Sequence, residues 1–135
     1  MKLNRHKIRE KALQTLFSLQ FNKVTVVEAL DFALYYEQEE TVSNAETVLQ
    51  LIEGVQSRRE EINELIRPHL KRWTLDRLPK LNLLIMQIAI YEMLMGQAPG
   101  IAINEAVQLT KEYSDEKDTR FVNAVLNNVK TALEQ

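Results

Sequence analysis

The chain has 135 residues, of which 45% are apolar and 27% are charged, a composition typical of one globular domain with a real core. It contains no cysteine, which excludes a disulfide framework, a thiolate metal site and a cysteine nucleophile. The basic N-terminus continues into an amphipathic pattern rather than the apolar block of a signal peptide, and the longest apolar stretch, residues 81–95, is too short and too polar to span a bilayer. We therefore expect a cytoplasmic protein without a membrane segment.

The charge is distributed unevenly along the chain, although the net charge is only −2. Residues 1–11 carry five Lys and Arg, including Lys2, against Glu10 alone. Residues 28–64 carry ten acids against two arginines. Such asymmetry indicates one face that attracts an anion and another that repels it.

The first half of the chain is predicted to be helical, because apolar residues recur at spacings of three and four. A first helix is expected from about residue 4 to 21. Thr25-Val-Val-Glu28 is a capping box, which predicts a second helix over about 26–39. A further capping box, Ser43-Asn-Ala-Glu46, predicts a third helix over about 44–66.

The second half is also predicted to be helical. Arg67-Pro68 ends the third helix, because the residue before a proline disfavours the α region. A short helix and a turn are expected over residues 68–78. Three further helices are predicted, over about 80–95, 102–113 and 118–133.

These elements predict an all-α fold of about seven helices in two lobes, about 1–67 and about 68–135. The helix over 80–95 is apolar on every side and is therefore expected at the centre of its lobe. Asp118 is the expected N-cap of the last helix.

Catalytic chemistry is hard to place in this sequence. Gly54, Gly96 and Gly100 fit neither the dinucleotide-binding nor the P-loop pattern. His6 and His69 both lie among Lys and Arg, which suits neither a metal cluster nor a carboxylate-oriented base. The sequence therefore predicts a protein that is not an enzyme and that binds no cofactor or metal.

The start of the first helix carries a cluster of cations at the end of a helix where cations are unfavourable. A helical wheel places Arg5 and Arg9 on one side and Lys7 and Lys11 on the opposite, solvated side. For Arg9 alone, pairing with an acid or with the end of a neighbouring helix explains the placement equally well. The whole cluster, which includes Lys2, is better explained by a bound polyanion.

Two other basic stretches have different interpretations. The cations of residues 67–73 suit the negative end of the preceding helix, and Trp73 is expected in the core. In the third stretch, Arg120 is expected in a first helical turn beside Phe121 and Asn123. A single-stranded nucleic acid needs this combination of a phosphate contact, a stacking surface and an edge reader.

Four motifs occur in order along nearly the whole chain: Arg5-His-Lys-Ile-Arg9-Glu-Lys-Ala-Leu-Gln14-Thr-Leu-Phe17, Ile90-Tyr-Glu92, Ala102-Ile-Asn-Glu-Ala-Val107 and Phe121-Val-Asn123-Ala-Val-Leu126. One such tripeptide would mean little, but the ordered set is specific. By these motifs the chain resembles the NusB family of transcription antitermination factors.

The resemblance implies two perpendicular helical bundles, no enzymatic activity, and binding of boxA, a single-stranded element of nascent ribosomal RNA transcripts. The implied partners are the ribosomal protein NusE and the RNA polymerase elongation complex with other Nus factors. The implied RNA contacts are Arg5, Lys7 and Arg9, with Arg120, Phe121 and Asn123 as the other wall. The implied NusE surface lies around Asp76, Asn82 and the start of the helix near residue 102.

Some positions depart from the family pattern. Asn82 stands where the family commonly has an acid, Gln87 where it commonly has an arginine, and Ala124 where it usually has glycine. These departures bear on the NusE charge pairing more than on the RNA role. Two alternatives remain open, a helical interaction module without RNA affinity and a NusB-like domain related to an RNA methyltransferase. At this length no cofactor-binding domain fits, which argues against the second alternative.

Overall fold

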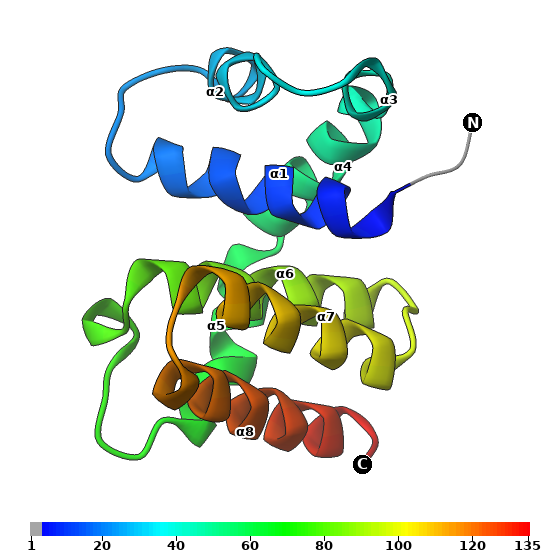
Figure 1. Ribbon diagram of the computed structural model, residues 1–135. Helices are drawn as coiled ribbons and strands as arrows, with labels where there is room; N and C mark the ends of the chain where they lie inside the picture. Colours follow the sequence, from blue (N-terminus) through cyan, green and yellow to red (C-terminus); the bar gives the residue numbers. More distant parts are fainter. Residues whose placement is uncertain (1–3) are drawn as a thin grey trace. The chain divides into compact units, whose positions relative to one another are not determined.

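The computed structural model describes residues 4–135, apart from the side chains of residues 40 and 41, so that Lys2 lies outside the described residues. In this range the chain forms eight α-helices and two short 3₁₀ turns, and none of it is in a β-strand (Figure 1). The prediction of an all-α fold is confirmed. None of the described helices is long and apolar enough to cross a membrane. The chain divides into two compact units, Met1–Gln56 and Ser57–Gln135.

The first unit contains four helices. They are α1 (Arg5–Leu19), α2 (Val26–Ala33), α3 (Glu39–Val42) and α4 (Ala45–Ser57). The capping box at α2 forms as predicted, since Thr25 Oγ1 accepts from the Glu28 amide and Glu28 Oε1 accepts from the Thr25 amide, both at 3.1 Å. The core of the unit consists of fully buried apolar side chains, among them Leu13, Leu16, Val48 and Ile52.

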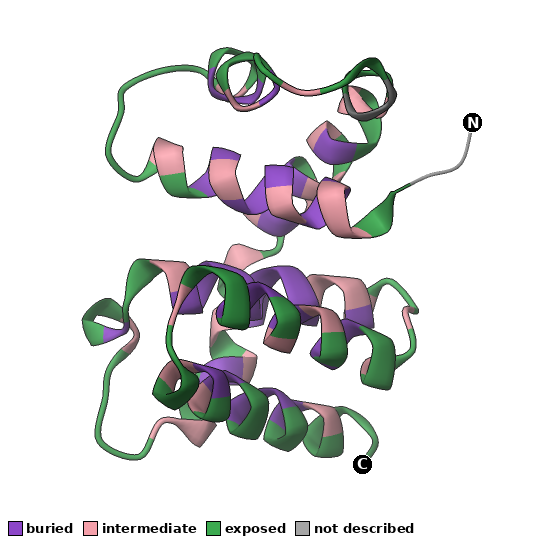
Figure 2. Ribbon diagram, in the orientation of Figure 1, coloured by how far each residue is buried: buried purple, intermediate pink, exposed green. Residues whose placement is uncertain are grey.

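The second unit is built around one helix. Its elements are α5 (Arg59–Ile66), the turns η1 (Arg67–His69) and η2 (Leu75–Arg77), α6 (Lys80–Leu94), α7 (Pro99–Tyr113) and α8 (Glu116–Leu133). Helix α6 packs against α5, α7 and α8. It is buried along most of its length (Figure 2), as its uniformly apolar sequence predicts.

Several helices differ in extent from the sequence prediction, among them α7, which begins at Pro99 and not at about residue 102. The expected helix over 44–66 is interrupted at Arg58, whose backbone (φ −108°, ψ 13°) leaves the helical region and separates α4 from α5. Because the units divide after Gln56, α5 belongs to the second unit and not to the first. The second helix ends at Ala33 instead of about residue 39, and its chain continues as a turn.

The cap predicted for the last helix is also wrong. Asp115 is the N-cap, because its extended backbone lets its side chain accept from the Asp118 amide at 2.8 Å. Asp118 lies inside the first turn, where its carboxylate accepts from the Ser114 hydroxyl at 2.7 Å. The helix therefore begins at Glu116, two residues earlier than expected.

The central position of α6 predicts that two isoleucines of the second unit contribute very differently to the free energy of unfolding. Ile90 in α6 is fully buried, whereas Ile101 in α7 is half exposed. We expect Ile90→Ala to lower the free energy of unfolding by about 2–5 kcal/mol, since it removes buried methyl groups and leaves a cavity. Ile101→Ala should change it by less than about 1 kcal/mol. Urea denaturation followed by circular dichroism measures both, and equal losses would contradict the central role of α6.

Candidate nucleic-acid interface

The basic start of α1 is stabilised by a cap and not by acids in its first turn. Asn4 is the N-cap, and its side chain accepts from the Lys7 amide at 3.1 Å. The first turn, all within the described part of the chain, holds no acid. The unfavourable placement of the cations is therefore offset elsewhere.

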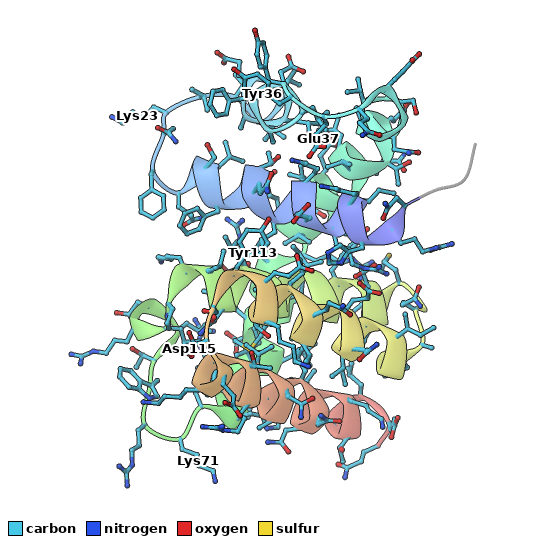
Figure 3. All side chains as sticks on the ribbon, in the orientation of Figure 1. Lys23, Tyr36, Glu37, Lys71, Tyr113 and Asp115 are labelled. Carbon is cyan, nitrogen blue, oxygen red and sulfur yellow. The ribbon has the colours of Figure 1, made fainter. Side chains whose placement is uncertain are left out.

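That offset comes from carboxylates around the two lysines. Lys7 Nζ lies 3.1 Å from Glu10 Oε1 and 3.5 Å from Glu37 Oε1, and Lys11 Nζ lies 2.5 Å from the same Glu37 oxygen. Glu37 reaches α1 from the segment between α2 and α3 (Figure 3). The hydrogen bond from Lys11 lowers the pKa of Glu37 below its usual value, and the hydrogen bond to Glu10 raises the pKa of Lys7.

These contacts change which cations can meet an external anion. Lys11 is only 6% exposed, so the expectation that it lies on a solvated side is wrong: its ammonium is drawn inward to Glu37. Arg9 is also buried, at 3% exposed. Lys7 is partly exposed, whereas the Arg5 side chain is exposed and has no hydrogen bond or ion pair with another described residue. Among the described members of the predicted cluster, Arg5 and in part Lys7 therefore present charge to solvent.

The third basic stretch lies at the start of α8, where the structure places acids beside its cation: Glu116 and Asp118 are in the first turn of the helix. Because the helix begins at Glu116, Arg120 lies in its second turn and not in its first. Arg120 Nη1 lies 3.2 Å from Glu116 Oε1, and both side chains are largely exposed. An ion pair of this kind contributes about 0–1 kcal/mol, so the Arg120 guanidinium stays accessible to a stronger anion.

Phe121 and Asn123 line different hollows of the surface. Two residues apart on a helix, they point to different sides of α8. Asn123 is exposed, accepts from Asn127 Nδ2 through its carbonyl oxygen at 2.8 Å, and lines a shallow depression with Lys130. Phe121 is half-buried and lines two other hollows of about 350 Å³ each.

Trp73 lines both of these hollows, together with Phe121. The expectation that Trp73 is in the core is wrong, since it is 54% exposed. It lies on the irregular segment between η1 and η2, which is outside the packed helices (Figure 1). The clue available in the sequence was the density of cations next to this tryptophan, in the stretch Arg67-Pro-His-Leu-Lys-Arg-Trp73.

The two hollows differ in charge. In one, which we call the basic hollow, Trp73 and Phe121 are joined by His69, Lys71, Arg72, Ala124, Val125 and Asn128, and none of these described lining residues is an acid. In the other, Arg77 and Lys117 are opposed by Asp115 and Asp118. Figure 3 shows Lys71 on the loop after α5 and Asp115 at the start of α8. A basic rim with two aromatic side chains is what a single-stranded nucleic acid needs.

The two residues expected to contact a protein partner are placed differently. Asp76 is exposed in η2, and a hydrogen bond from the Thr74 hydroxyl lowers its pKa, so its carboxylate is ionised at neutral pH. Asn82 is buried on α6, and its Oδ1 has no hydrogen-bond partner among the described residues. Gln87 is buried as well and donates through Nε2 to Asn63 Oδ1 at 2.8 Å. Of the expected pair, Asp76 alone offers a surface group.

Comparison with known proteins decides the family. The family model of the NusB family matches residues 6–131. The chain belongs to the NusB family. It is 47% identical to the transcription antitermination protein NusB of Enterococcus faecalis, over 94% of this chain and 89% of that protein. It is 38% identical to the NusB of Bacillus subtilis, over 98% of this chain and 99% of that protein.

A solved structure gives the same result at the level of the fold. The chain is similar to a crystal structure of the antitermination factors NusB and NusE in complex with dsRNA, with a TM-score of 0.80 and 25% identity over 95% of this chain and 96% of that one. The predicted family membership is thereby confirmed. The relatives bear the name of a transcription factor and not of an enzyme, in agreement with the non-enzymatic expectation.

The ion pairs of Glu37 predict a pH-dependent contribution to stability. Replacing Glu37 with Gln leaves the buried Lys11 without its carboxylate, so we expect the free energy of unfolding to fall by about 1–3 kcal/mol at neutral pH. Because the folded pKa of Glu37 is lowered from 4.5, its stabilisation is complete above that value and disappears as the pH falls through the folded pKa.

The difference between wild type and Glu37→Gln should accordingly shrink in acid, as measured by denaturant unfolding across a pH series. Glu46→Gln, which changes an exposed acid of the same unit, is the matched control and should stay close to wild type at every pH. A difference between wild type and Glu37→Gln that is independent of pH would contradict the charge pairing.

Proposed function

We propose that this NusB-family protein is an RNA-binding transcription antitermination factor. In this proposal it binds boxA-type single-stranded RNA in nascent ribosomal RNA transcripts together with NusE. The assembly acts on the RNA polymerase elongation complex with other Nus factors. The names of the relatives support the antitermination role, and the similar structure of NusB with NusE and dsRNA supports RNA and NusE as ligands.

The basic hollow is the observation that carries the RNA part of the proposal. Its half-exposed indole and half-buried phenyl ring are available to unstacked bases, and Lys71 and Arg72 supply charge for the phosphates beside them. Bases of a duplex are stacked and paired, and an aromatic hollow cannot reach their faces. The hollow therefore favours a single strand as the preferred ligand.

The other RNA contacts are proposed for those cations of the predicted sites whose side chains are exposed. Arg5 and Lys7 on the first unit and Arg120 on the second provide accessible positive charge. Two of the expected contacts receive less weight. Arg9 is buried, and Asn123 lies on a different side of α8 from Phe121.

For NusE, we propose that Asp76 offers an ionised carboxylate to a cation of the partner. Asn82 is almost fully buried at the base of the hollow that also contains Arg77 and Asp115, and in this proposal it contributes through the packing of α6 more than through a charge contact.

A salt series tests the charged contacts. We expect the log–log slope of RNA affinity against salt to be about −0.7 per phosphate contact for a single strand. Arg5→Ala or Arg120→Ala should each make the slope less negative by the contribution of about one phosphate contact. Arg58→Ala is the matched control, because Arg58 is likewise an exposed arginine at the start of a helix. Its Nη1 lies 3.5 Å from Oε1 of Glu61, in the first turn of α5. Fluorescence anisotropy with a boxA RNA, with and without NusE, gives these values. Absence of binding at low salt even with NusE would contradict the proposal and favour an interaction module without RNA affinity.

Substitution of the aromatic residues should weaken RNA binding without changing its dependence on salt. Trp73→Ala and Phe121→Ala should each weaken binding by about 1–3 kcal/mol with the salt slope unchanged, because a stacked ring contributes little to counterion release. Phe21→Ala removes an exposed phenyl ring from the first unit and is the control. Unchanged RNA affinity of a folded Trp73→Ala protein would show that the basic hollow is not the base-binding site.

A further inference from the structure

The outer side of α2 and of the turn that follows it carries an unusual set of side chains. Its inner side packs into the first unit through Ala29, Leu30 and Leu34. Its outer side is exposed, and we call it the aromatic–acidic face: Val27, Glu28, Asp31, Phe32, Tyr35 and Tyr36.

The three aromatic side chains of this face are almost fully in solvent. Phe32 is 84% exposed, Tyr35 74% and Tyr36 94%. The two tyrosine rings pack edge to face with their centroids 4.7 Å apart. Figure 3 shows Tyr36 on the side of α2 that faces away from α1. A contiguous exposed aromatic group of this kind is typical of an interaction site.

The charge around the rings restricts what can bind there. Residues 24–56 contain seven acids and no Lys, Arg or His. On α2, Val27 and Asp31 are one turn apart, and so are Glu28 and Phe32, so each acid has an apolar neighbour on the same face. A nucleic acid or an anionic membrane is repelled by such a face.

The acids of the face still have capacity for a cation. The Asp31 carboxylate has no hydrogen bond or ion pair with another residue in the described ranges. Glu28 caps α2 through one oxygen, and the hydrogen bond from the Thr25 amide lowers its pKa, which keeps it ionised. At the end of the face, Glu37 already holds two ammonium groups, those of Lys7 and Lys11, which shows that this part of the unit attracts cations.

We propose that the aromatic–acidic face binds an arginine-rich segment of a partner protein. A guanidinium can stack on a phenyl or phenol ring while it donates to a carboxylate one helical turn away, and it is more weakly hydrated than an ammonium. The face is thus selective for arginine over lysine. It is separate in chemistry from the proposed RNA contacts, which are basic, and it does not depend on them.

The test uses the full-length chain and two fluorescent peptides of equal charge, an alanine-spaced arginine peptide and its lysine counterpart, in anisotropy titrations at physiological salt. We expect the arginine peptide to bind several-fold more tightly than the lysine peptide. Phe32→Ser or Tyr36→Ser should weaken it about three- to fivefold each, the size of an exposed cation–π contact. Asp31→Asn should weaken it to a similar extent, and Glu46→Gln, an exposed acid outside the face, should not.

Three results would overturn the proposal. The first is equal binding of the two peptides, or binding unaffected by Phe32→Ser, Tyr36→Ser and Asp31→Asn. The second is a loss of boxA RNA affinity in these variants, which would place the face in the RNA site. The third is a concentration-dependent dimer in sedimentation that Tyr36→Ser abolishes, which would make a second copy of the chain the occupant. Because RNA binding is measured separately, failure of this proposal and failure of the proposed function are distinguishable.

Discussion

Burial of α6 on every side is the constraint on which the second unit depends. A helix without a polar face needs neighbours all round, and α5, α7 and α8 supply them. With these helices committed to the core, the connections between them lie at the edge of the unit. Trp73 and the cations beside it stand on one such connection, next to Phe121 at the margin of the packed face of α8. The apolar core thus creates the basic hollow indirectly, by leaving this segment outside.

In the first unit, charge pairing decides which cations are available. Glu37 pairs with the ammonium group of Lys11 and, at a longer distance, with that of Lys7. Lys11 is therefore not available to an external anion, and Lys7 is only partly available. The pairing also lets α1 carry cations at the end where they are unfavourable. The basic cluster therefore serves both stability and function. Lys7 and Lys11 join α1 to the segment after α2 through Glu37, and the exposed Arg5 can contact an external anion.

The sequence predicted the fold better than the site, for physical reasons. The all-α class, the capping box at Thr25 and the central helix follow from local patterns of three to fifteen residues. The burial of Lys11 could not be predicted, because Glu37 is far away in sequence and reaches it only through the packing of α2 on α1. The exposure of Trp73 depends on the path of a segment without regular structure. The motif comparison still pointed to the correct family, since it does not depend on which side chains are exposed.

The intrinsic fluorescence of the protein tests the central claim most directly, because Trp73 is its one tryptophan. If the basic hollow holds an unstacked base, titration with boxA RNA quenches the Trp73 emission with the same midpoint as the anisotropy change of a labelled RNA. Tight RNA binding by anisotropy with the emission of Trp73 unchanged would contradict the account and place the RNA elsewhere on the protein.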